Sequence, residues 1–104
     1  GIAPNSYTYN AGITACGKEG RWAEAVAMLR EMPKKGVAPD EVSYLSAIEA
    51  CGTGGQWALA VALLREMSAP SPAGVIAYTA AITACGDSGQ WELAVGLLRE
   101  MTDS

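Results

Sequence analysis

Apolar residues recur along this chain at the spacing of one helix face. In the first segment, Tyr9, Ile13 and Cys16 follow the spacing i, i+4, i+7. The next segment has a wider apolar stripe, formed by Trp22, Ala25, Val26, Leu29 and Met32. Both patterns return twice, and no strand-like alternation competes with them. We therefore predict six helices, near residues 6–17, 21–33, 41–52, 56–68, 73–86 and 90–102.

Glycine and short polar side chains mark the ends of these helices. Residues 17–20 end the first helix and offer glycine for a left-handed cap. Asn5 and Asp40 stand where an N-cap is wanted, just before a first helix. Ser71, followed by Pro72, can do the same for the third unit. These signals predict three antiparallel helical hairpins.

The hairpin pattern is an internal repeat. Cys16, Cys51 and Cys85 are separated by 35 and then 34 residues, and the three tryptophans show the same intervals. A two-helix unit of this size cannot bury both its faces alone, but stacked copies can, and about three are the usual minimum. We therefore expect one all-α domain, an α-solenoid of three tandem helix-turn-helix repeats with right-handed superhelical stacking. The expected domain is 1–104, with repeats at about 1–35, 36–69 and 70–104.

The two ends of this solenoid carry further expectations. The last helix has no helix after it, so we expect Leu93, Leu97 and Leu98, or the surface beside them, to be exposed. Such exposure favours self-association through the terminal helices. Because the chain begins at Gly1 rather than Met, we expect it to be a fragment of a longer repeat array.

Composition narrows the class of partner. Half of the 104 residues are apolar, yet the apolar runs are far too short to span a bilayer, so we expect no membrane partner. The net charge of −4 argues against simple charge-driven binding to phosphates. Residues 1–35 carry a net +2, whereas 36–69 and 70–104 each carry −3. An anion-binding surface should therefore favour the first third.

The sequence offers no set of residues for catalysis. Equivalent cysteines on stacked helices lie about 8–10 Å apart, too far for a disulfide, so we expect three reduced thiols and a reducing compartment. The chain has no histidine, no metal-ligand spacing, no nucleotide-binding loop and no nucleophile–base pair. We expect no cofactor, no metal and no enzymatic activity. The recurring Tyr, Trp and Cys are interpreted as packing residues, and the Arg-Glu-Met endings as helix-surface pairs.

The three repeats share their sequence over nearly the whole chain, as APNSYTYNAGITACGKEGRWAEAVAMLREM, GVAPDEVSYLSAIEACGTGGQWALAVALLREM and VIAYTAAITACGDSGQWELAVGLLREM. These segments resemble the pentatricopeptide repeat family. Tetratricopeptide repeats have similar length but place a Trp in the first helix, whereas here Trp opens the second. Resemblance to the pentatricopeptide family implies single-stranded RNA binding in mitochondria or plastids, with one nucleotide per repeat on the concave face of the first helices.

The resemblance also implies roles for single residues. The residue after the first-helix Tyr and the last residue of the repeat choose the base, which in unit one gives Asn10 and Asp40, a uracil-preferring pair. The residue two before that Tyr packs against the base, and a Lys near the end of the helix tends to meet phosphate, a position that Lys18 occupies in unit one. The base-packing residues are Tyr7, Val42 and Ile76.

The other two units depart from this pattern. Leu45 and Gly74 occupy the base-choosing positions of unit two, and neither side chain can hydrogen-bond a base. Thr79 is the base-reading residue of unit three and suits a purine. Thr53 and Asp87 replace the phosphate-facing lysine.

Two functions follow as hypotheses. The first is sequence-selective binding of single-stranded RNA in support of organellar RNA processing, stability or translation. The alternative is a protein-interaction or structural scaffold with no RNA binding, in which Asn10 and Asp40 act only in helix capping. The acidic second and third units favour this alternative.

Overall fold

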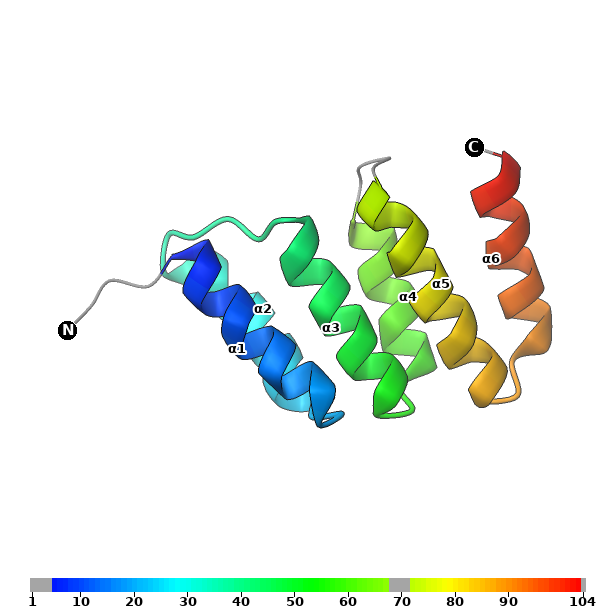
Figure 1. Ribbon diagram of the computed structural model, residues 1–104, viewed down its shortest axis with the longest axis horizontal. Coiled ribbons are helices and arrows are strands. Elements are labelled where there is room, and N and C mark those ends of the chain that lie inside the picture. The colour runs from blue at the N-terminus through cyan, green and yellow to red at the C-terminus, as the bar shows by residue number, and fades with distance from the viewer. Residues whose placement is uncertain (1–4, 68–71, 104) are drawn as a thin grey trace.

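Six α-helices account for the regular structure of the described chain. The structure, a computed structural model, describes residues 5–67 and 72–103 (Figure 1). Its helices are α1 (Ser6–Lys18), α2 (Trp22–Lys34), α3 (Glu41–Thr53), α4 (Trp57–Glu66), α5 (Pro72–Asp87) and α6 (Trp91–Asp103). Every end lies within two residues of its predicted place, so the six-helix prediction is confirmed.

The first helices of units one and two begin at the predicted caps. The side chain of Asn5 accepts a hydrogen bond from the Thr8 N–H at 2.9 Å, and that of Asp40 accepts one from the Ser43 N–H at 3.0 Å. The hydroxyls of Thr8 and Ser43 accept in return from the N–H of the cap residue, at 2.9 and 3.1 Å. Both ends therefore form capping boxes. The predicted cap at Ser71 lies outside the described residues.

Each hairpin turns on a glycine with positive φ. After α1, Gly20 adopts φ 66°, and the next N–H, from Arg21, donates to the Cys16 carbonyl at 2.9 Å. The same turn follows α3 at Gly55 and α5 at Gly89. This left-handed cap, predicted from the glycines, closes the first helix and returns the chain antiparallel to it.

The helices form two rows, and neighbouring helices lie closer together in the row of first helices than in the row of second helices. Helices α1, α3 and α5 pack against one another along the long axis of a molecule of 47 × 27 × 18 Å (Figure 1). Small residues allow this, since a Cβ on Gly17 would lie 3.3 Å from the Ser46 carbonyl oxygen. Helices α2 and α4 instead pack against the first helices on either side and, within the described residues, not closely against each other. A stack that is closer along one row curves toward that row.

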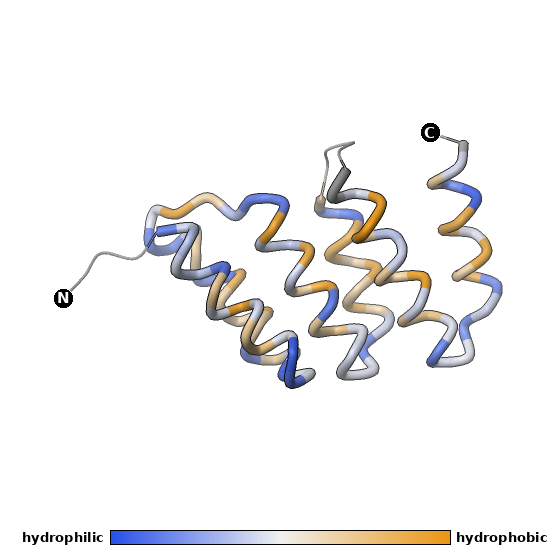
Figure 2. The backbone as a smooth tube through the Cα atoms, viewed as in Figure 1, coloured by the Kyte–Doolittle hydropathy of each residue, from blue (hydrophilic) through white to orange (hydrophobic). Residues whose placement is uncertain are grey.

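The buried core is rich in small residues. Among the described residues, sixteen apolar ones are buried, of which seven are alanine, and the larger ones include Ile13, Leu29, Ile48, Leu63 and Leu97. Apolar and polar stretches alternate along the helices (Figure 2). The one-sided, amphipathic pattern is clearest in α2 and α6, whereas α3 is packed by neighbours on several sides.

Several packing predictions are confirmed, and others are wrong. Tyr9, Tyr44 and Tyr78 pack against the core, and all three cysteines are free thiols. Trp22 lies so close to Gly54 that a Cβ there would be 2.5 Å from the indole Cδ1, but Trp91 is 67% exposed. Leu98 is exposed as predicted, whereas Leu97 is fully buried because it faces the core formed with α5.

The charged helix endings also differ from the prediction. Arg30 on α2 pairs with Glu66 on α4, and Arg65 on α4 pairs with Glu100 on α6. These ion pairs join successive units, so they are not pairs on one helix surface. On α4, Arg65 pairs with the following unit and its neighbour Glu66 with the preceding one, since adjacent residues of a helix point about 100° apart.

Candidate nucleic-acid interface

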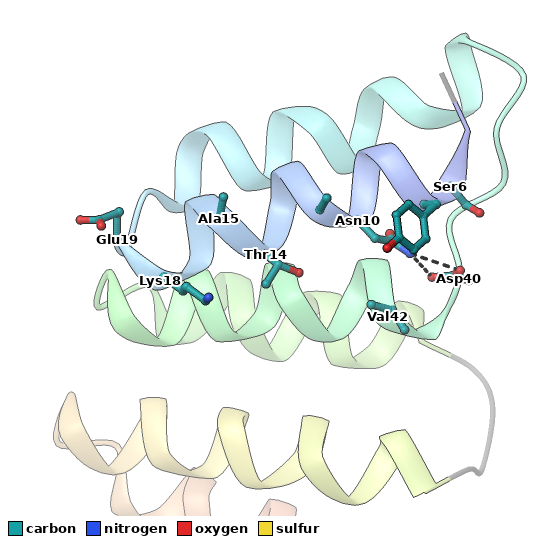
Figure 3. A pocket seen from close by; sticks show the side chains of 10 residues that line it. Ser6, Asn10, Thr14, Ala15, Lys18, Glu19, Asp40 and Val42 are labelled. Carbon is teal, nitrogen blue, oxygen red and sulfur yellow. Dashed lines mark hydrogen bonds between the residues drawn. The ribbon is translucent and has the colours of Figure 1, made fainter. Parts of the chain in front are cut away.

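A groove runs along α1 and the beginning of α3 (Figure 3). Its volume is about 840 Å³. It brings together five of the residues predicted for RNA binding: Tyr7, Asn10, Lys18, Asp40 and Val42. Ile76 and Thr79, the other two, lie on α5 and do not line this groove.

The three predicted base-packing residues are exposed near the beginnings of α1, α3 and α5. Tyr7 is 81% exposed, Val42 50% and Ile76 53%. Single exposed apolar side chains are common on protein surfaces, but these three recur at the same position of each unit. An accessible ring or branched side chain can pack against the face of a base. Their role in RNA binding stays a prediction.

Asn10 and Asp40, 30 residues apart in sequence, are joined directly in space. The Asn10 Nδ2 donates to both carboxylate oxygens of Asp40, at 3.1 and 3.3 Å (Figure 3). Stacking of α1 on α3 brings them together, because Asp40 caps α3 while Asn10 lies on the adjacent face of α1. The pairing that the family resemblance implied is therefore present as a geometry, whereas its use in base recognition is not tested.

The carboxyl of Asp40 is held in its ionised form. Partial burial alone raises its pKa, but hydrogen bonds from the Ser43 N–H, the Asn10 amide and the Ser43 hydroxyl outweigh burial. The net effect is that the pKa of Asp40 lies below its ordinary value. At neutral pH this side chain is an acceptor, so it fixes the Asn10 amide with its nitrogen toward the carboxylate.

Lys18 lies at the other end of the groove, in the last turn of α1. It is eight residues beyond Asn10, or about 12 Å along the helix axis. Its flexible side chain can meet a phosphate next to a base held at Asn10. Glu19 and Asp40 also line the groove, however, so one cation faces two carboxylates. Charge alone therefore gives this groove little attraction for a polyanion.

Units two and three present different chemistry at the equivalent positions. Leu45 packs partly buried against the core, and Gly74 has no side chain to offer. The Thr79 hydroxyl donates to the Val75 carbonyl of its own helix at 2.8 Å, so only its lone pairs remain for a base.

The positions equivalent to Lys18 lie beside a second, acidic hollow. This hollow of about 270 Å³ between α3 and α5 is lined by Thr53, Asp87 and Glu49, among others. Its carboxylates would repel phosphate, as the sequence suggested for Asp87.

Two side chains at the α1–α3 contact were missed by sequence reasoning. The Ser43 hydroxyl is within hydrogen-bond distance of the Asn10 Oδ1, and Ser46 pairs with Thr14 at 2.9 Å. The spacing from Asp40 to Ser43 is a capping-box signal that could have drawn attention to Ser43. Nothing in a single sequence indicates that the same hydroxyl also reaches α1.

The described residues hold no group of three Cys, Asp or Glu side chains arranged for a metal ion. In the same part of the chain, no helix is long and apolar enough to cross a membrane.

The fold and groove define an α-solenoid repeat protein with polar and apolar side chains exposed on its first helices. Residues 4–53 match the PPR repeat family, and residues 42–69 and 76–104 each match the PPR repeat. The chain belongs to the pentatricopeptide repeat (PPR) family. PPR repeats are generally associated with RNA binding, and proteins built from them are typically non-enzymatic helical scaffolds. No curated protein matches the chain.

Proposed function

We propose that this chain binds single-stranded RNA along its first-helix row and that unit one prefers uracil. The observation that carries the proposal is the joined Asn10–Asp40 pair in a groove shared with Tyr7, Val42 and Lys18. Tyr7 from α1 and Val42 from α3 supply apolar surface for a base. The Asn10 amide retains one N–H and one oxygen lone pair, which match the carbonyl and N–H groups on the edge of uracil.

The same geometry implies weak binding. Three repeats would contact about three nucleotides, and stacking contributes about 1–3 kcal/mol per base before the cost of association. With one lysine–phosphate contact, the logarithm of the binding constant for a single strand should fall with the logarithm of the salt concentration with a slope of about −0.7. Affinity of this chain alone should therefore be low and should depend little on salt.

The proposal is tested by fluorescence anisotropy with labelled U-rich, A-rich and C-rich oligonucleotides at low salt. We expect the wild type to prefer U-rich RNA and Asn10→Ala to lose that preference. Gln90→Ala, an exposed change in the turn before α6, is the matched control and should bind as the wild type does. Lys18→Gln should remove most of the salt dependence. Absence of binding to any of the RNAs at low salt would overturn the proposal.

A second candidate is a protein-interaction scaffold. It is favoured by the acidic hollow between α3 and α5 and by three exposed apolar side chains on α6, which are Trp91, Val95 and Leu98. This function predicts self-association or a protein partner without RNA binding. Light scattering after size-exclusion chromatography, run with and without labelled RNA, separates the two candidates.

We also propose that the full-length protein acts in a mitochondrion or plastid, in RNA processing, stability or translation. The family resemblance supports this location. Imaging of the full-length gene product fused to a fluorescent protein tests it, and a distribution outside both organelles would contradict it.

A further inference from the structure

Ser43 is a fully buried polar side chain at the contact between α1 and α3. Its Oγ lies 3.1 Å from the Asp40 N–H nitrogen, 3.0 Å from the Asp40 Oδ1 and within hydrogen-bond distance of the Asn10 Oδ1. A hydroxyl has one hydrogen and two lone pairs. It accepts from the Asp40 N–H, and its single hydrogen is shared between the Asp40 Oδ1 and the Asn10 Oδ1, of which the Asn10 oxygen is the nearer.

This contact completes the restraint on the Asn10 amide. The amide nitrogen donates to Asp40, and the amide oxygen accepts from Ser43. Rotation of the amide by 180° would place its oxygen against the Asp40 carboxylate, where two acceptors repel. The amide therefore has one orientation, and the groups that it presents to the groove are fixed.

The position of Ser43 can be compared with the equivalent position in the next unit, and the comparison associates the hydroxyl with the base-choosing residues. In unit one the base-choosing residues Asn10 and Asp40 are polar, and the hydroxyl of Ser43 meets them. In unit two, Leu45 and Gly74 replace the pair, and the residue equivalent to Ser43 is Ala77, also fully buried. The buried hydroxyl is present where there is a polar pair to orient and absent where there is none.

We propose that Ser43 is a positioning residue for base discrimination: its hydroxyl holds the Asn10 amide in the orientation that reads the base. This inference rests on the proposed RNA binding. It adds a third residue, from the following unit, to the pair that the family resemblance implied. The capping box needs the same hydroxyl only for the Asp40 N–H, as the Thr8 hydroxyl does for Asn5.

Two matched pairs of variants test the inference. Ser43→Ala removes the hydroxyl at a site where Ala77 shows that alanine fits, and Thr8→Ala removes the equivalent capping hydroxyl without touching Asn10. Ser43→Thr and Ser43→Val have the same shape, but only threonine retains the hydroxyl. The readout is the ratio of affinities for U-rich and C-rich RNA, measured well below the melting temperature.

We expect Ser43→Ala and Ser43→Val to lower this ratio about three- to tenfold, the worth of one hydrogen bond, while Thr8→Ala and Ser43→Thr preserve it. In the NMR spectrum of the free protein, the Asn10 side-chain NH₂ should become more mobile in Ser43→Ala.

If the wild type discriminates between the two RNAs and the alanine and valine variants do so equally well, the role of Ser43 is overturned while RNA binding stands. If the wild type binds no RNA, the proposed function fails, and the role of Ser43 in discrimination fails with it.

Discussion

Arg30 on α2 donates through both terminal nitrogens to the carboxylate of Glu66 on α4, at 2.6 and 2.7 Å. Arg65 and Glu100 repeat the arrangement between α4 and α6. Because the second helices do not pack closely on one another in the described chain, these long side chains span the wider side of the stack. The recurring Arg-Glu dipeptide therefore supplies the ion pairs that join the second helices of successive units.

A double-mutant cycle on Arg30→Ala and Glu66→Ala measures this contact. Both side chains are roughly half exposed, so we expect a coupling free energy of about 0.2–1 kcal/mol, which shrinks in high salt. The same cycle on Arg21, the N-cap residue of α2, and Glu24 in its first turn, which pair at 3.1 Å within one unit, is the control and should give about 0.2–0.5 kcal/mol. Urea unfolding gives all the values. A zero coupling at low salt would show that the ion pair does not join the units in solution.

Acid should destabilise the fold below about pH 5. Hydrogen bonds from Arg30 and Arg65 lower the pKa of Glu66 and of Glu100, and the pKa of Asp40 is also lowered. These carboxylates stabilise the folded state fully above their unfolded pKa values, about 3.9–4.3, and this contribution is lost as the pH falls through the folded ones.

Thermal melting between pH 7 and pH 2.5 measures this dependence. We expect a nearly constant melting temperature down to about pH 5 and a decline below it. Asp40→Asn should have a shallower decline, because one titrating group is gone. A melting temperature that rises on acidification would contradict the assignment of these hydrogen bonds.

Two glycines should respond to alanine in opposite directions. A Cβ on Gly54 would lie 2.5 Å from the Trp22 indole and 2.9 Å from the Gly20 carbonyl oxygen, so Gly54→Ala should cost about 1–3 kcal/mol. Gly96 lies within α6, where such a Cβ would meet nothing within 4 Å apart from the backbone of its own helix and its chain neighbours, so Gly96→Ala should stabilise by about 0.5–1 kcal/mol. Urea unfolding of both variants tests the contrast. Equal effects would mean that Trp22 does not pack on the turn of the next unit.

The cysteines should differ in reactivity although they are equivalent in the repeat. Burial raises the pKa of Cys51 to about 11 and also raises the pKa of Cys85, whereas Cys16 is only half-buried. We expect an alkylating reagent at pH 8 to modify Cys16 in the folded protein and the other two only after unfolding. Mass spectrometry of timed samples identifies the order. Modification of Cys51 first would contradict its burial between units.

Much of the fold could be predicted from the sequence because it follows from local rules. The 34–35-residue repeat, the apolar stripes, the caps at Asn5 and Asp40 and the turn glycines each act within a few residues. Because these signals agree, they predict all six helices. The same rules do not show which side of a helix meets the neighbouring unit. For this reason the predicted exposure of Leu97 and the predicted pairing of Arg and Glu on one helix surface were wrong.

The candidate site was predictable in part. The family resemblance predicted RNA-binding roles for Tyr7, Asn10, Lys18, Asp40 and Val42, and all five line one groove in the structure. Two features depend on how α1 stacks on α3, so they could not be derived from periodicity: the Ser43 hydroxyl under Asn10 and the excess of carboxylates around Lys18.

The most direct test of RNA binding at this groove is a titration of the ¹⁵N-labelled protein with a short U-rich RNA, followed by NMR. We predict that the largest shifts occur at Tyr7, Val42, Lys18 and the side-chain NH₂ of Asn10, while α6 is almost unaffected. An A-rich RNA of equal length should shift the same backbone signals less. Shifts concentrated on α6 or on the second helices, or no shifts with excess RNA, would contradict the account.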